Sequence, residues 1–165
     1  MPLTVVADSR AKHTLADRRA QFDLSKKLAA MLGDMSVAVD RLNLVRLALD
    51  SRAQSLPAGD PLIARLRSAS SSVDALRKKI VATKEGGAIT GEERLRENLA
   101  DLYSSVNGYD GRPTQMELDR TEAIGRELAN IVRDYDAWLA RELPAINSAL
   151  GAKKMETIAV PPEKK

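Results

Sequence analysis

The chain has 165 residues, of which 44% are hydrophobic and 30% charged, a composition typical of one globular domain rather than a disordered or membrane-embedded chain. It contains no cysteine and a single histidine, His13. Disulfides, thiolate metal sites and cysteine nucleophiles are therefore excluded, and a metal site or catalytic triad has at most one imidazole. Residues 1–90 carry a net charge of +6 and residues 91–142 one of −5, which favours helices that attract one another over binding to a polyanion.

Residues 1–13 precede any helical pattern. The first six residues lack the basic region and the apolar stretch of a signal peptide. No apolar run in the chain approaches the roughly 20 residues that cross a bilayer. Leu3–Val6 has the composition of a strand, but one strand needs a partner sheet. We predict an extended linker or strand over 1–13 and no membrane insertion.

Residues 14–56 have the pattern of one long helix. Apolar residues recur from Leu24 to Leu49 at alternating spacings of four and three, which is the heptad seam of a helix that packs on other helices. Thr14 and Asp17 are spaced as a capping box, and a Leu-Pro-Ala-Gly sequence ends the pattern. About 42 helical residues make a rod of roughly 60 Å.

Two shorter helices are predicted next. Asp60 and Pro61 combine an N-cap carboxylate with a first-turn proline, and the seam then runs over 62–80 until paired glycines stop it. A capping box over 90–93 predicts the start of a third helix, whose seam occupies 95–106.

A fourth helix is predicted from a capping box at Thr114 and Glu117. Its seam runs over 124–150 and slips by one residue at Trp138, close to Pro144, so we expect a kink or a new short helix there. Lysines and prolines dominate the residues after this seam. We predict a flexible tail over 152–165.

Short connections between amphipathic segments make sequential helices antiparallel neighbours. The predicted fold is therefore all-α: an up-down-up-down four-helix bundle over 14–151, with two long and two shorter helices and a short extended N-terminal segment.

Motifs that carry chemistry are scarce. No Glu-x-x-His pair is present, and the carboxylates flank the seams as solvated faces do. The glycine-containing stretch 86–91 lacks the Gly-Lys-Ser/Thr ending of a phosphate loop. A basic stretch on the second helix faces an acidic third helix, which disfavours nucleic acid; it consists of Arg65, Arg67, Arg77, Lys78 and Lys79. We predict no enzyme activity, no cofactor and no metal.

Two places are candidates for partner binding. The loop residues Tyr109, Asp110 and Arg112 either form a stiff turn against the bundle end or serve recognition. The first helix outruns the second, so part of its seam lacks an obvious partner. We expect Leu24, Leu28 and Met31 to pack on the end of the fourth helix or on a second copy of the chain. The residues expected on the fourth helix are Leu143, Ile146 and Leu150.

Five short stretches of the chain belong together, namely 5–10, 16–17, 21–24, 108–114 and 143–147. They resemble the C-terminal helical region of large bacterial sortilin-like, BNR-repeat β-propeller proteins, which are often labelled glycosyl hydrolases. The family opening reads Val-x-Asp-Pro-Arg, and Ser9 stands here in place of its proline. The resemblance implies a bacterial domain that follows a β-domain in an exported, extracellular or periplasmic protein. The propeller chemistry belongs to a region outside this chain, so no catalytic residue is carried over.

Two functions are the resulting hypotheses. The first is a non-enzymatic structural or protein-interaction module, joined to a parent β-domain or binding a protein partner. The alternative is a free-standing, cytoplasmic helical adaptor or regulator that binds a partner helix or, less favoured, a polyanion.

Overall fold

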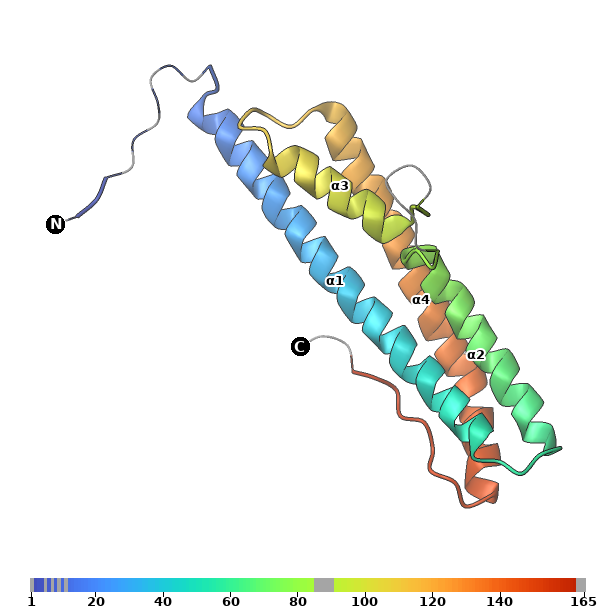
Figure 1. Ribbon diagram of the computed structural model, residues 1–165. Coiled ribbons are helices and arrows are strands. Elements are labelled where there is room, and N and C mark those ends of the chain that lie inside the picture. The colour runs from blue at the N-terminus through green and yellow to red at the C-terminus, as the bar shows by residue number, and fades with distance from the viewer. Residues whose placement is uncertain are drawn as a thin grey trace.

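The computed structural model describes residues 2–4, 6, 8, 10, 12–84 and 91–162. All regular structure within these residues is helical (Figure 1). The helices are α1 (Leu15–Gln54), α2 (Pro61–Ile80), α3 (Leu95–Asn107) and α4 (Gln115–Ala152). The predicted all-α class is confirmed. In the described part of the chain, no helix combines the length and apolarity needed to cross a membrane.

Side chains cap the N-termini of α1, α2 and α4 at the residues that the sequence predicted. The Thr14 hydroxyl accepts the Asp17 N–H, and the Asp17 carboxylate accepts the Thr14 N–H at 3.0 Å. Thr114 and Glu117 form the same capping box at α4. The Asp60 carboxylate accepts the first-turn N–H of α2 at 2.9 Å. These caps satisfy amides that have no partner within the helix.

The predicted seams form one core. The α1 seam is buried, apart from the half-buried Met31, and the α3 seam is buried throughout. Tyr135 and Trp138 are 2% and 6% exposed, as expected for core residues. Removal of this apolar surface from water is the dominant stabilising contribution to the fold.

α1 and α4 run parallel. The Met31 methyl of α1 faces Gly125 of α4, and further along both helices the Tyr135 hydroxyl donates to the Arg41 carbonyl at 3.0 Å. Contacting positions therefore advance together along the two helices. The starts of α1 and α4 lie at the same end of the molecule (Figure 1).

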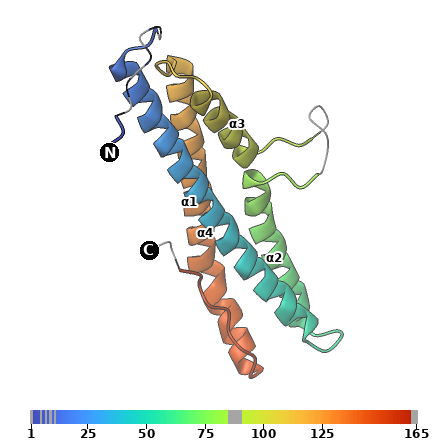
Figure 2. The ribbon, with the colours of Figure 1, turned by 60° about the vertical axis from the view of Figure 1, so that its left-hand side comes forward.

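α2 and α3 both run antiparallel to α4. The contacting pairs are Asp60 with Lys153, Lys79 with Asp134, Asn98 with Arg120, and Ser105 with Glu117. α2 and α3 therefore follow one another end to end, and both views show them together alongside α1 (Figures 1 and 2).

The bundle thus has three rods in cross-section, namely α1, α4 and the composite of α2 and α3. This order replaces the predicted up-down-up-down arrangement. The physical reason is the connection over 81–94, which is long enough to let the chain continue in the same direction. Within it, the expected capping box over 90–93 falls partly outside the described residues. α3 begins only at Leu95, where the Glu97 carboxylate accepts the Arg94 N–H at 3.0 Å.

Glu92 holds the described part of that connection in place. Its carboxylate accepts the Thr83 N–H at 2.9 Å and pairs with Arg94. The hydrogen bond from the Thr83 backbone is the main reason why the pKa of Glu92 falls to about 2.

α4 continues through Pro144 without a break in its helical assignment, so no new helix starts there. It ends in a Schellman motif, with Lys154 in the left-handed region at φ 58° and the Met155 N–H donating to the Leu150 carbonyl at 3.0 Å. The chain then reverses and runs back along the bundle (Figures 1 and 2). The prediction of a flexible tail from residue 152 is corrected here, because Ile158 is only 4% exposed.

Candidate functional site

The loop with Tyr109, Asp110 and Arg112 lies at the end of the bundle where α1 begins. The Tyr109 ring meets His13 edge-on with ring centroids 5.1 Å apart, and it covers the buried Gly111. Tyr109 is 54% exposed, and Asp110 and Arg112 are exposed as well. The loop therefore packs on the bundle end and still presents polar side chains to solvent.

The three seam residues named as partner-binding candidates lie mostly inside the chain. Leu24 and Leu28 are 6% and 0% exposed, and only Met31 reaches the surface. The expected contact with Leu143, Ile146 and Leu150 is wrong. These residues belong to the end of α4 that lies beside the end of α1, because the two helices run parallel. The structure has no uncovered stripe at Leu24 and Leu28 that would require a second copy.

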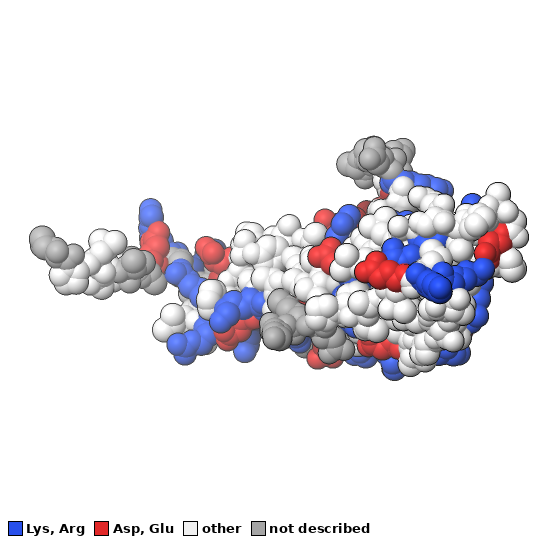
Figure 3. All heavy atoms as spheres, turned by 90° about the horizontal axis from the view of Figure 1, so that it is seen from below, with Lys and Arg blue, Asp and Glu red and all other residues white. Residues whose placement is uncertain are grey.

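The basic stretch on α2 is largely neutralised. Arg77 and Lys78 each bind Asp74 at 2.8 Å, and Lys79 lies 4.0 Å from Asp134. Cationic and anionic side chains alternate on the face seen from below (Figure 3). A continuous polyanion surface would need unopposed cations.

No group of three or more His, Asp or Glu side chains within the described residues is arranged to hold a metal ion. The glycine-containing stretch lies outside the described residues except for Gly91. Two grooves lie beside α4, one on each side of it.

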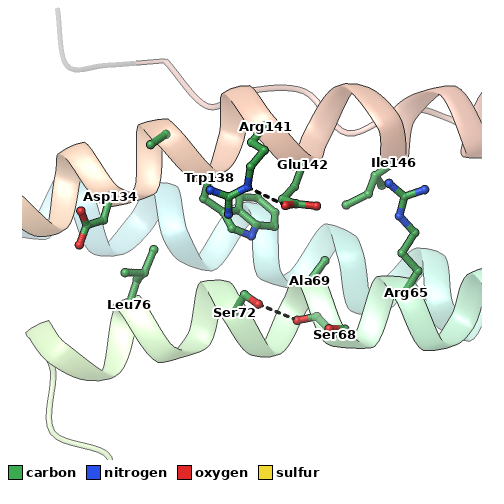
Figure 4. A pocket seen from close by; sticks show the side chains of 11 residues that line it. Arg65, Ser68, Ala69, Ser72, Leu76, Asp134, Trp138, Arg141, Glu142 and Ile146 are labelled. Carbon is green, nitrogen blue, oxygen red and sulfur yellow. Dashed lines mark hydrogen bonds and ion pairs between the residues drawn. The ribbon is translucent and has the colours of Figure 1, made fainter.

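The first groove lies between α2 and α4 and encloses about 600 Å³ (Figure 4). Ser68 and Ser72 line its α2 side, and the indole of Trp138 forms its α4 side. Asp134 stands near one end and Arg65 near the other (Figure 4). The groove is therefore rimmed by polar and charged groups that water can solvate.

Arg141 and Glu142 complete the rim of this α2/α4 groove. They form an ion pair at 2.8 Å, in which the Arg141 side chain is 69% exposed. An ion pair this exposed contributes little free energy.

The second groove lies between α1 and α4 and is apolar. Its lower part encloses about 450 Å³ and is bordered at one end by Asp136; its apolar lining is Leu139, Ala140, Leu143, Pro144 and Val160. Asp136 also borders an upper part of about 500 Å³, whose apolar lining is Met31, Gly125, Leu128, Ala129 and Val132.

A segment of the chain itself lies along the lower part of this α1/α4 groove, where Val160 lines it. The carboxamide of Asn147 donates to the Ile158 carbonyl at 2.9 Å and accepts the Ile158 N–H at 2.8 Å. Arg52 of α1 donates to the Glu156 carbonyl at 2.9 Å and to its carboxylate at 2.6 Å. Residues 155–161, which we call the docked segment, are thus held by side chains from both helices.

Arg41 lies at the junction of the two parts of the groove. It is 7% exposed, bonds to Asp136 at 3.1 Å through one terminal nitrogen, and has a buried Nε without a hydrogen-bond partner. Its guanidinium lies 5.3 Å from the Tyr135 ring centroid. Burial raises the pKa of Tyr135 to about 12, so its hydroxyl remains a donor.

Sequence reasoning missed Asn147, Ile158 and Arg41. Asn147 is adjacent to the seam residue Ile146, where a polar residue has the pattern of a solvated face. Ile158 lies in a short stretch without periodicity. Their pairing depends on a chain reversal at Lys154, a residue type that does not usually mark one.

No family model, curated protein or solved structure matches the chain. The resemblance to the helical region of bacterial sortilin-like β-propeller proteins therefore stays a prediction.

Proposed function

We propose that this chain is a non-enzymatic helical-bundle domain that acts as a structural or protein-interaction module. The observation that carries the proposal is the α1/α4 groove, which holds a non-helical segment of the chain through the carboxamide of Asn147. A groove that satisfies backbone groups and buries an apolar side chain has the properties of a polypeptide-binding surface.

The chemistry of the chain supports the same proposal. Cysteine is absent, and the single histidine packs edge-on against Tyr109. On the rim of the α2/α4 groove, Arg141 is exposed and Glu142 is half-buried, and Trp138 belongs to the core. These groups suit recognition, whereas a reaction needs acids and bases gathered in a cleft.

The alternative function, a polyanion-binding regulator, is less well supported. Among the α2 cations, Arg77, Lys78 and Lys79 are paired with carboxylates. If a polyanion were bound through phosphate contacts, its affinity would fall steeply with salt. Titration with a DNA duplex at low and high salt distinguishes the two functions.

The test of the proposal is position-dependent photo-crosslinking in the cells of origin. A photoreactive residue is placed at Ala140 in the α1/α4 groove, or at Ala137 in the α2/α4 groove. Ala64, an exposed residue of α2, is the matched control. We expect a discrete crosslinked protein from Ala140 and not from Ala64. Equal crosslinking at all three positions, or none at Ala140, would contradict the proposal.

A further inference from the structure

The docked segment lies in the α1/α4 groove as a bound peptide would. After the reversal at Lys154 it has no helical structure and runs back along α4 (Figure 2). Asn147 satisfies both the N–H and the carbonyl of Ile158, a contact that does not depend on the side chain at that position. The same geometry is therefore open to the backbone of another polypeptide.

Side-chain recognition rests on few positions. Ile158 and Pro161 are buried, whereas the intervening Ala159 is exposed and Val160 is 55% exposed. Thr157 is exposed as well. The buried side chains of the docked segment are thus a branched apolar residue and, three residues later, a proline.

The docked segment leaves part of the groove unsatisfied. The ion pair from Arg52 ends on a Glu156 side chain that is 84% exposed, so it holds the segment weakly. Beside Val160, the buried Nε of Arg41 has no acceptor. Beyond Asp136, the apolar lining continues toward Met31. A longer or better-matched segment has contacts available that the docked segment does not make.

We propose that the α1/α4 groove binds an extended segment of a partner protein, and that the docked segment is an intramolecular competitor which this partner displaces. The partner segment has a branched apolar residue in the place of Ile158, a proline three residues later, and a carbonyl or carboxylate that accepts from Arg41. This inference rests on the proposed interaction function and adds the chemistry of the ligand and its regulation.

The experiment uses the full chain and a synthetic peptide with the sequence of residues 155–162. Ile158→Asp releases the docked segment, because a carboxylate is costly to bury in an apolar groove. Thr157→Asp is the matched control, since it adds the same charge at an exposed neighbour. Binding of the fluorescently labelled peptide is measured by anisotropy, and folding by circular dichroism. If Ile158→Asp does not fold, Ile158→Ala replaces it.

We expect the released variant to bind the peptide with an affinity at least about tenfold higher than the wild-type chain and Thr157→Asp, because a tethered segment competes at a high effective concentration. Adding Asn147→Ala to the released variant should weaken peptide binding by about tenfold. This change removes the hydrogen bonds between the Asn147 carboxamide and the peptide backbone, which join uncharged groups and contribute modestly to affinity. A peptide with aspartate in place of its isoleucine should not bind.

Three results would overturn the inference. They are a folded, released variant that does not bind the peptide, binding that is unaffected by Asn147→Ala, and a wild-type dimer in sedimentation that Ile158→Asp dissociates. The last result would assign the groove to the segment of a second copy. If the peptide binds but no protein is crosslinked from Ala140, the proposed function is wrong and the inferred ligand chemistry of the groove still holds. The two failures are therefore distinguishable.

Discussion

The two grooves beside α4 differ in what covers them. The α2/α4 groove is rimmed by Arg65, Asp134 and Arg141, and no other segment of the described chain lies among its lining residues. The α1/α4 groove is lined mostly by apolar side chains, and Val160 of the docked segment forms one wall of its lower part. One helix therefore borders a solvated groove on one side and a partly covered apolar groove on the other.

Hydration explains the difference. Charged side chains on a groove rim keep their water, so an open polar groove costs little free energy. An apolar groove of similar size gains stability when a segment covers it. No described residue of the docked segment lines the upper part toward Met31, which therefore stays open beside α4.

The largest effect on the free energy of unfolding is expected at Trp138, which belongs to the core and also lines the α2/α4 groove. Trp138→Ala removes a side chain from a residue that is only 6% exposed and should lower the free energy of unfolding by about 3–5 kcal/mol. Urea unfolding followed by circular dichroism measures it. A loss below about 1 kcal/mol would mean that the indole belongs to the solvated groove rather than to the core.

Ile158→Ala tests the cover of the α1/α4 groove. The expected loss is about 1–2 kcal/mol, at the low end for such a truncation, because the docked segment can detach without opening the helices. Hydrogen exchange should show faster exchange at the Ile158 amide, with α4 amides unchanged. Faster exchange throughout α4 would contradict separate unfolding of the segment.

The described part of the connection between α2 and α3 lines neither groove and serves as a reference for the effect of pH. Its Glu92 has a pKa lowered from 4.5 to about 2 by the Thr83 backbone hydrogen bond and then by Arg94. A carboxyl group whose pKa is lower in the folded than in the unfolded state stabilises the fold at pH values above its unfolded-state pKa. For Glu92 this stabilisation is lost as the pH falls toward 2. Glu92→Gln should therefore lower the urea midpoint near neutral pH, and the difference from wild type should vanish near pH 2. Glu93→Gln, an exposed neighbour, should show no such convergence.

Lys154 sets the direction in which the docked segment leaves α4. Its left-handed backbone is strained for a residue with a Cβ. Lys154→Gly should stabilise the chain by about 0.5–1 kcal/mol. Lys154→Ala keeps the strain and should give no gain in thermal unfolding. An equal gain from both changes would point to the lost charge instead.

The smallest effects are expected on the rim of the α2/α4 groove. Arg65→Ala and Arg141→Ala should each change the free energy of unfolding by less than about 0.5 kcal/mol, since both side chains are exposed. A larger loss in urea unfolding would show that the rim stabilises the fold and would remove the contrast with the α1/α4 groove.

Much of the fold was predictable because the signals are local. The capping boxes at Thr14 and Thr114 and the Asp60 cap depend on residues within one turn. The burial of Leu28, Leu66 and Leu99 follows from heptad spacing along a single helix. The surface grooves were not predictable, since each is formed by side chains from two helices whose pairing depends on the direction of the chain.

The sequence by itself determined which residues form helices, where most of those helices begin and which side chains make the core. Tertiary structure decided that α3 continues α2 instead of reversing, because contacts far apart in the sequence, such as those of Lys79 with Asp134 and of Asn98 with Arg120, place both helices antiparallel to α4. It also decided that Ile158 meets Asn147. That contact joins a reversal at Lys154 to a groove between two parallel helices, and no local pattern encodes either of them.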